Sequence, residues 1–198
     1  NRNSMTAKKN NYRPDIDGLR AIALISVVLF HAEFELFSGG FVGVDVFFVI
    51  SGFLITSIIL SESAQNKFSL VNFYERRARR ILPALFIVLF SCLPFAWFWL
   101  TPTDLKGFSQ SVVSVTFFSS NILFWLETGY WGVANELKPL LHTWSLGIEE
   151  QYYIIFPILL ILVGRFGKKS IFYSFLILFL ASLFTANWAS FTFPSAAF

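Results

Sequence analysis

Long apolar runs with few charges constrain this chain more than any other feature. Six of them follow one another along the sequence: Leu19–Phe37, Val46–Ser61, Ile81–Thr103, Gly107–Leu126, Gln151–Gly164 and Ser170–Phe198. A helix that crosses a bilayer needs about 20 mainly apolar residues, so the shorter runs must borrow flanking residues. We therefore predict an all-α fold, a polytopic transmembrane helix bundle with about five to six membrane segments.

The composition excludes several other classes of protein. Only 14% of the 198 residues are charged, whereas a water-soluble domain carries roughly 25%. The single cysteine, Cys92, excludes a disulfide framework and a cysteine-based metal site. The net charge of +3 arises from basic residues that membrane topology accounts for. We expect membrane lipids as surroundings, and no metal, tightly bound cofactor or nucleic-acid partner.

Basic residues predict the orientation, because they concentrate in cytoplasmic loops. They gather in three segments: Arg2, Lys8, Lys9 and Arg13; Lys67, Arg76, Arg77, Arg79 and Arg80; and Arg165, Lys168 and Lys169. Residues 1–13 are thus expected to be a cytoplasmic tail, with the membrane region at 14–198. Acidic Glu127 and Glu136 are expected on the outer side. The chain is expected to be the N-terminal portion of one membrane domain whose C-terminal part is absent.

The run Gly107–Leu126 raises a problem of parity. If every run between Arg80 and Arg165 crossed the membrane, three crossings would leave Lys168 and Lys169 outside. This run is also the most polar of the six. Backbone that does not span is tolerated at membrane depth where protein or water surrounds it. We expect residues 107–126 to be re-entrant, or to lie within the protein on the outer side.

Ionisable side chains inside a membrane helix are costly, so each is a functional candidate. Arg20 and His31 are eleven residues apart, about 20° beyond three full turns, and therefore share a helix face. The rise between them is roughly 16 Å, which predicts Arg20 at the cytoplasmic mouth and His31 near mid-membrane. The alternatives are a snorkelling arginine and a core histidine bonded to a neighbouring helix. Asp45 opens the second run as a substrate contact, an ion-pair partner or a helix N-terminal carboxylate.

Four arginines follow a capping-box pattern, Asn72-x-x-Glu75, which predicts a short helix entering the third run. They are Arg76, Arg77, Arg79 and Arg80. Guanidinium groups bind phosphates through forked hydrogen bonds, so a cytoplasmic cluster suits an anionic ligand. A plain membrane anchor is the alternative. Among the four we favour Arg76 and Arg80, which share a helix face, over Arg77.

A second polar stripe is predicted after residue 140. Ser145, Glu149 and Tyr153 are spaced four apart, so they share one helix face, and His142 precedes them. The adjacent Glu149 and Glu150 cannot both point the same way. We therefore assign Glu149 to the cavity and expect Glu150 to be solvated.

Four ordered blocks resemble a known family. They are Tyr12–Ala23 with His31 following, Gly39–Ile55, Phe73–Pro83 and His142–Tyr153. Together they look like the signatures of the acyltransferase-3 family, integral-membrane O-acyltransferases that modify extracytoplasmic polysaccharides. The last block is similar to the subgroup that carries a C-terminal SGNH domain.

The resemblance implies a bacterial inner-membrane enzyme with a cytoplasmic N-terminus. Its donor would be acyl-coenzyme A, expected to be acetyl-CoA, and its acceptor a hydroxyl of a cell-envelope glycan. His31 becomes the catalytic base with Arg20 as its helix partner, and we add Glu149 as a third catalytic candidate. The substrate-binding candidates are Arg76, Arg79, Arg80, Asp45, His142 and Ser145.

Elementary chemistry agrees with the role given to His31, because a positioned imidazole can take the proton of a poorly nucleophilic sugar hydroxyl. The main alternative is a transporter or flippase in which Arg20, His31 and Glu149 relay protons or hold an anion. A non-catalytic scaffold and an inactive truncated homologue are further alternatives. The acceptor is left open among lipopolysaccharide O-antigen, peptidoglycan, exopolysaccharide and a smaller glycoside.

Overall fold

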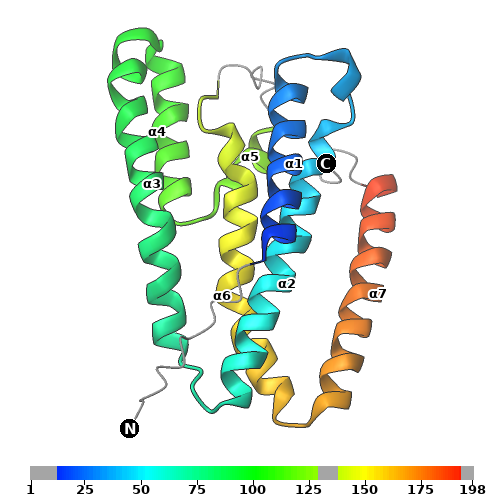
Figure 1. Ribbon diagram of the computed structural model, residues 1–198. Coiled ribbons are helices and arrows are strands. Elements are labelled where there is room, and N and C mark those ends of the chain that lie inside the picture. The colour runs from blue at the N-terminus through cyan, green and yellow to red at the C-terminus, as the bar shows by residue number, and fades with distance from the viewer. Residues whose placement is uncertain (1–12, 129–137, 193–198) are drawn as a thin grey trace, which may run out of the picture. The chain divides into compact units, whose positions relative to one another are not determined.

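A computed structural model describes residues 13–128 and 138–192, and these ranges contain helices and no strand (Figure 1). In chain order the elements are α1 (Pro14–His31), η1 (Glu35–Phe37), η2 (Gly40–Val42), α2 (Gly43–Ala64), α3 (Leu70–Trp99), α4 (Pro102–Thr116), α5 (Ser120–Thr128), η4 (Leu141–Thr143), α6 (Trp144–Gly164) and α7 (Lys168–Thr192). The predicted all-α class is confirmed. Arg2, Lys8, Lys9 and Glu136, on which part of the topology prediction rests, lie outside the described residues.

Four helical segments of the described chain are long and apolar enough to cross a membrane. They are Gly40–Ala64, Leu70–Trp99, Leu141–Gly164 and Lys168–Thr192. Helix α1 is not among them, because its 18 residues leave no apolar stretch of that length without Asp15, Asp17 and Arg20. The predicted count of five to six membrane segments is therefore approximate.

The chain forms two compact units, residues 1–58 and 59–198, with the boundary inside α2. In the first unit, α1 packs against η2 and the start of α2 through two glycines. A Cβ on Gly40 would collide with the carbonyl of Ser26, and one on Gly43 would lie 2.5 Å from the carbonyl of Ala23. Because only glycine permits this approach of one backbone to another, the two positions fix how α1 packs.

The start of α1 is set by local charges and by proline. Pro14 takes the first helical turn, where its missing N–H costs nothing. Asp15 and Asp17 place negative charge at the positive end of the helix dipole. Hydrogen bonds from Arg13 lower the pKa of the Asp15 carboxyl to about 2, so this charge persists throughout the physiological range.

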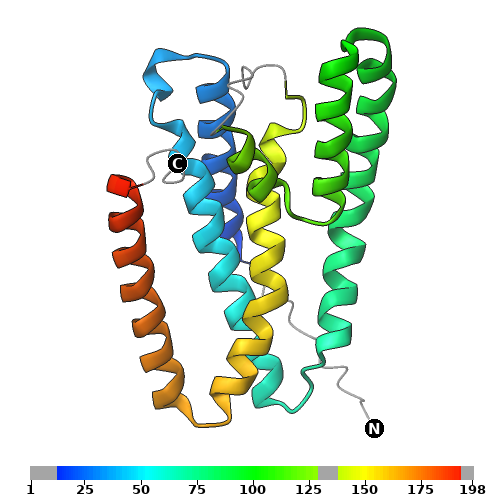
Figure 2. The same ribbon diagram turned by 180° about the vertical axis from the view of Figure 1, so that it is seen from behind.

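In the second unit, α3 and α4 lie antiparallel and form a hydrophobic core (Figure 2). The buried side chains are Leu85, Leu89 and Ala96 from α3, Phe108 and Val115 from α4, and Leu140. Helix α3 begins after Ser69, whose hydroxyl accepts from the backbone N–H of Asn72 at 3.4 Å. The predicted start at Asn72 is therefore wrong, because the true capping hydroxyl lies three residues earlier.

The polar run 107–126 does not form one long helix. It is divided between α4 (15 residues) and α5 (nine residues), both too short to span a bilayer. Phe118 ends α4 in the left-handed region (φ 54°), and Ser119 N–H closes the turn on the carbonyl of Ser114 at 2.8 Å. Helix α4 runs back along α3, and α5 then turns toward the end from which α4 began (Figures 1 and 2). Re-entry of this segment into the membrane stays a prediction.

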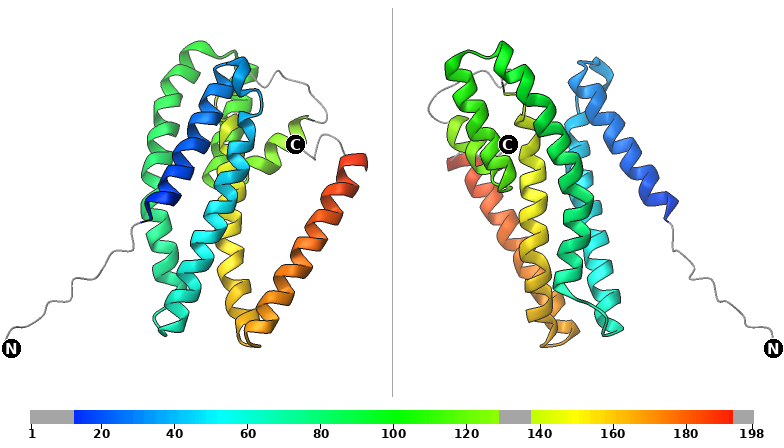
Figure 3. Two further views of the ribbon diagram at one scale, coloured as in Figure 1. Left: turned by 45° about the vertical axis from the view of Figure 1, so that its right-hand side comes forward. Right: turned by 90° about the vertical axis from the view of Figure 1, so that its left-hand side faces the viewer.

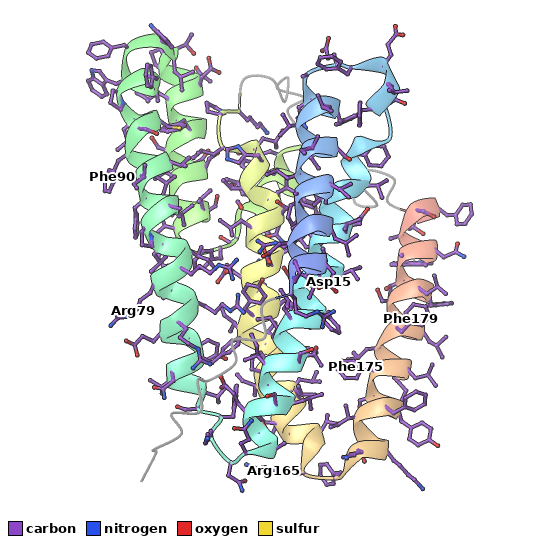
Figure 4. All side chains as sticks on the ribbon, in the orientation of Figure 1. Asp15, Arg79, Phe90, Arg165, Phe175 and Phe179 are labelled. Carbon is purple, nitrogen blue, oxygen red and sulfur yellow. The ribbon has the colours of Figure 1, made fainter. Side chains whose placement is uncertain are left out.

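Helix α6 runs antiparallel to α3, and α7 diverges from α6 after a short turn (Figure 3). Phe156 and Phe175 contact each other near this turn, with ring centroids 5.7 Å apart. The end of α6, marked by Arg165 in Figure 4, lies at the same end of the unit as the start of α3. The basic loop before α3 and the basic loop after α6 therefore lie at the same end of the second unit. The parity argument requires this, because it places both loops on one side of the membrane.

Candidate functional site

The last residue of α1 is His31, whose imidazole is exposed in the structure. Its Nδ1 lies 2.9 Å from the carbonyl oxygen of Val27, one turn back. A carbonyl only accepts hydrogen bonds, so Nδ1 carries the proton, and Nε2 of the neutral ring keeps its lone pair. The ring of Phe30 packs edge-on against the imidazole at 5.3 Å between centroids. The local structure thus leaves Nε2 as the ring nitrogen that is available to a substrate.

The backbone after His31 ends α1 sharply. Glu33 is in the left-handed region (φ 58°), Phe34 N–H bonds to the carbonyl of Leu29 at 3.1 Å, and Glu33 N–H bonds to that of Phe30 at 3.0 Å. This is the Schellman arrangement, which favours glycine at the position that Glu33 occupies. A non-glycine residue there costs roughly 1 kcal/mol. The strain coincides with a pocket of about 410 Å³ lined by Phe30, His31, Glu33, Phe34, Glu35 and Ser38.

Arg20 and Asp45 occupy different parts of the first unit's helices. Arg20 lies on the same continuous helix as His31, as predicted, and is partly buried. Asp45 is exposed in the first turn of α2. That position suits a carboxylate at a helix N-terminus, which is one of the alternatives drawn from the sequence.

Two of the four arginines near the start of α3 are held by carboxylates of the second unit. Arg76 Nη2 bonds to Glu62 at 3.0 and 3.1 Å, and Arg79 pairs with Glu75 at 2.7 Å one turn away. These pairs are largely solvent-exposed and thus weak, and Arg79 projects from the outside of α3 in Figure 4. Arg80 is exposed and has no ion pair within the described part of the chain.

The predicted stripe on α6 is present. The Tyr153 hydroxyl donates a short hydrogen bond to Glu149, and the Ser145 hydroxyl donates to the carbonyl of His142 at 3.2 Å. Ser145 and Glu149 are partly buried, and His142 is exposed in η4. The structure thus joins Glu149 to Tyr153 and Ser145 to His142.

The sequence assigns the wrong exposure to Glu150. Its side chain is 7% exposed, whereas Glu149 is only partly buried. A signal for this exists in the sequence, because Glu150 is in helical phase with Gly147, Tyr153 and Leu160, which are all buried. The expectation that Glu150 is solvated is therefore wrong.

Arg77, the arginine that the sequence favours least, contacts α6. Its Cζ lies 4.9 Å from the ring centroid of Tyr153 and 5.7 Å from that of Phe73. It also interacts electrostatically with Glu149 and Glu150. Helical spacing gives the angles between the arginines of α3, but it does not show which face of α3 is turned toward α6. The sequence therefore does not predict the contact of Arg77 with Tyr153. The polar centre of the second unit is thus built from Arg77 and the Glu149–Tyr153 segment.

An amide network fixes α5 on α6 next to this centre. Gln151 Nε2 donates to the carbonyl of Phe118 at 2.8 Å and to Asn121 Oδ1 at 2.9 Å. The Ser120 hydroxyl donates to the carbonyl of Thr143 at 2.9 Å. A Cβ on Gly147 would lie only 3.1 Å from Asn121 Oδ1. These bonds account for several of the polar residues in the 107–126 run.

The described residues define a helical membrane protein with an exposed imidazole at the end of α1 and a buried polar centre between α3 and α6. Residues 13–198 match the acyltransferase domain family. The O-acetyltransferase OatA of Staphylococcus aureus (strain NCTC 8325 / PS 47) is 38% identical over 176 residues, which cover 87% of this chain and 29% of the relative. The peptidoglycan O-acetyltransferase OatA of Listeria monocytogenes serovar 1/2a is 37% identical over 166 residues, covering 83% of this chain and 26% of the relative.

The chain therefore belongs to the acyltransferase family, which confirms the resemblance seen in its four sequence blocks, and it is a multi-pass membrane protein. It spans less than a third of the length of these two relatives. No solved structure matches it.

Proposed function

We propose that this chain is part of a bacterial inner-membrane O-acetyltransferase. The proposed reaction moves an acetyl group from cytoplasmic acetyl-CoA to a hydroxyl of peptidoglycan outside the membrane. The family match supports the acyl transfer, and the name of the Listeria relative, a peptidoglycan O-acetyltransferase, supports peptidoglycan over the other acceptors. The observation that carries the proposal is the imidazole of His31, whose Nδ1 faces the Val27 carbonyl and whose Nε2 remains free.

The proposed step balances without a further reactant. Nε2 of His31 takes the proton of the acceptor hydroxyl as its oxygen attacks the thioester carbonyl. The new C–O ester bond forms, the C–S bond breaks, and the coenzyme A thiolate leaves with the electron pair. The imidazolium then returns its proton to that sulfur. Arg20, on the same helix, is the proposed electrostatic partner of this site, and Glu149 stays a third catalytic candidate.

The basic cluster of α3 is the proposed contact for the phosphates of coenzyme A. Arg80 is available for this role because no ion pair engages it within the described ranges, and the exposed pairs of Arg76 and Arg79 are weak enough for a phosphate to replace. Asp45, His142 and Ser145 stay proposed substrate contacts. A cytoplasmic N-terminus and a C-terminal SGNH domain stay predictions for the whole protein.

Mass spectrometry of the cell wall tests the proposal. Strains with and without the complete gene are compared for acetyl ester on their glycan strands. We expect the ester to be absent from the strain that lacks the gene. A parental copy of the gene should restore it, and a copy with His31→Ala should not. A transporter would move its substrate unchanged, so an unaltered ester content would overturn the proposal.

A further inference from the structure

Glu150 of α6 is the one buried carboxylic side chain among the described residues. It is 7% exposed, and its Oε1 atom has no hydrogen-bond partner within the described chain. Buried polar atoms are nearly always paired, because leaving one unpaired forfeits its hydration without compensation. A carboxylate oxygen in this position therefore needs a donor from outside the described residues.

Arg77 of α3 is the cationic group near this oxygen. Its guanidinium interacts electrostatically with Glu150, yet the two groups form no ion pair within 4.0 Å. Stacking on Tyr153, at 4.9 Å from the ring centroid, places the guanidinium against α6. The hydroxyl of Tyr74 donates to the carbonyl of Ile154 at 2.8 Å and fixes α3 against the same turn. These two contacts fix the position of Arg77 relative to α6, and they keep its guanidinium out of ion-pair distance from Glu150.

The depth of this pair points to function. Tyr153 lies eleven residues before the end of α6 at Gly164, a rise of about 16 Å, or roughly half the hydrocarbon thickness. Ionisable groups at such depth are costly and mark sites for substrates, ions or protons. A membrane anchor would lie near the surface, so anchoring does not account for Arg77.

The chemistry of the two side chains restricts the ligand. A guanidinium only donates hydrogen bonds and a carboxylate only accepts them. A group that bridges them must offer an acceptor to Arg77 and a donor to Glu150. An anion would be repelled by Glu150 and a cation by Arg77, whereas a secondary amide has both functions and no charge.

We propose that Arg77 and Glu150 form a substrate subsite that binds a secondary amide. The inference rests on the proposed function, because both substrates of that reaction carry this group. The pantetheine arm of coenzyme A has two secondary amides, and the sugars of peptidoglycan carry N-acetyl groups. Both the pantetheine arm and the N-acetyl sugars offer a secondary amide, and binding measurements with a probe for each show which one the subsite takes.

Calorimetry on the full-length protein in lipid nanodiscs tests the subsite with two probes, pantetheine and an N-acetylglucosamine tetramer. We expect the parent to bind at least one probe and Glu150→Leu to weaken that binding tenfold or more. Glu150→Gln keeps an acceptor oxygen and should stay within about fivefold of the parent. Arg77→Lys keeps the charge but loses the planar fork, so at least fivefold weaker binding is expected.

Glu127→Gln is the matched control, because it removes another partly buried carboxylate of the second unit, the partner of Lys138. It should alter stability but not the binding of either probe. If Glu150→Leu fails to fold, Arg77→Lys and Glu150→Gln decide. Parental affinity in Arg77→Lys would overturn the subsite, as would equal losses in Glu150→Gln and Glu150→Leu, or a parent that binds neither probe.

The outcome is separable from that of the proposed function. If calorimetry shows probe binding that depends on Glu150, but the cell wall carries no ester that depends on the gene, the subsite is retained and the acetyl transfer is refuted. If the ester depends on the gene, but substitution of Glu150 leaves probe binding unchanged, only the subsite is overturned.

Discussion

The two polar regions of this chain are built in opposite ways. Around His31, small residues bring backbones together, and the imidazole stays exposed at the end of α1. Around Glu150, long side chains such as Arg77 reach between α3 and α6, and the carboxylate is buried. The first region should therefore be sensitive to residue size at positions without chemistry. The second should be sensitive to the donors and acceptors that its side chains offer.

The largest effect is expected at His31 itself. His31→Ala removes the proposed base and should lower transfer by about 10²–10⁴-fold. His31→Gln should lose transfer as well, because a neutral amide does not take up a proton at neutral pH. The measurement is acetyl ester formed per amount of inserted protein. Ser26→Ala on the same helix should retain parental transfer, and activity of His31→Ala within a few-fold of the parent would remove its role.

Size sensitivity in the first region is tested by a pair of glycine substitutions. Gly40→Ala forces α1 away from η2, because its Cβ would collide with the Ser26 carbonyl. We expect a loss of about 1–3 kcal/mol in stability, with reduced transfer. Gly18→Ala is the control, since a Cβ there meets nothing within 4 Å. It should leave thermal stability unchanged or raise it, and equal Tm values for both variants would refute the close-packing account.

Replacing Arg76, Arg79 and Arg80 together with Lys separates ligand binding from anchoring, and Arg77 is kept because it belongs to the proposed amide subsite. Lysine satisfies positive-inside topology but lacks the planar fork that holds phosphate. We expect the KM for acetyl-CoA to rise tenfold or more with unchanged insertion, since one lost charge-assisted bond costs about 1.5–3 kcal/mol. Steady-state kinetics in proteoliposomes measure this change. Unchanged kinetics would reduce the cluster to a membrane anchor.

The smallest effect is expected at the strained end of α1. Glu33→Gly relieves a left-handed backbone conformation (φ 58°), and should stabilise the first unit by about 1 kcal/mol. Thermal unfolding followed by circular dichroism measures it. The comparison is Asn66→Gly, a second left-handed position with a φ of 52°. A lower Tm in Glu33→Gly would show that the glutamate side chain contributes more than the strain costs.

Much of the fold follows from the sequence, because apolar runs must form helices in a bilayer. The polarity of residues 107–126 correctly predicts that this run is not a single spanning helix. The start of α3 is misjudged because Ser69 and Asn72 both precede a helical pattern. Only the extended backbone of Ser69 and its bond to Asn72 identify the cap.

The sites are less predictable than the helices, for physical reasons. The spacing of Arg20 and His31 correctly places both on one helix, but nothing in the sequence shows that Val27 fixes the ring. The contacts of Gly40 carry no chemical signature, since glycine has no side chain to classify. Burial of Glu150 depends on which face of α6 meets its neighbours, and a count of polar spacing selects Glu149 instead.

Transfer across a sealed membrane is the most direct test of the account. Purified full-length protein is reconstituted in proteoliposomes and sorted by orientation, with labelled acetyl-CoA on the proposed cytoplasmic side and peptidoglycan oligosaccharide on the other. We predict labelled ester on the oligosaccharide with the parent and none with His31→Ala. Equal labelling with His31→Ala, or no labelled oligosaccharide with an intact, inserted parent, would contradict the account.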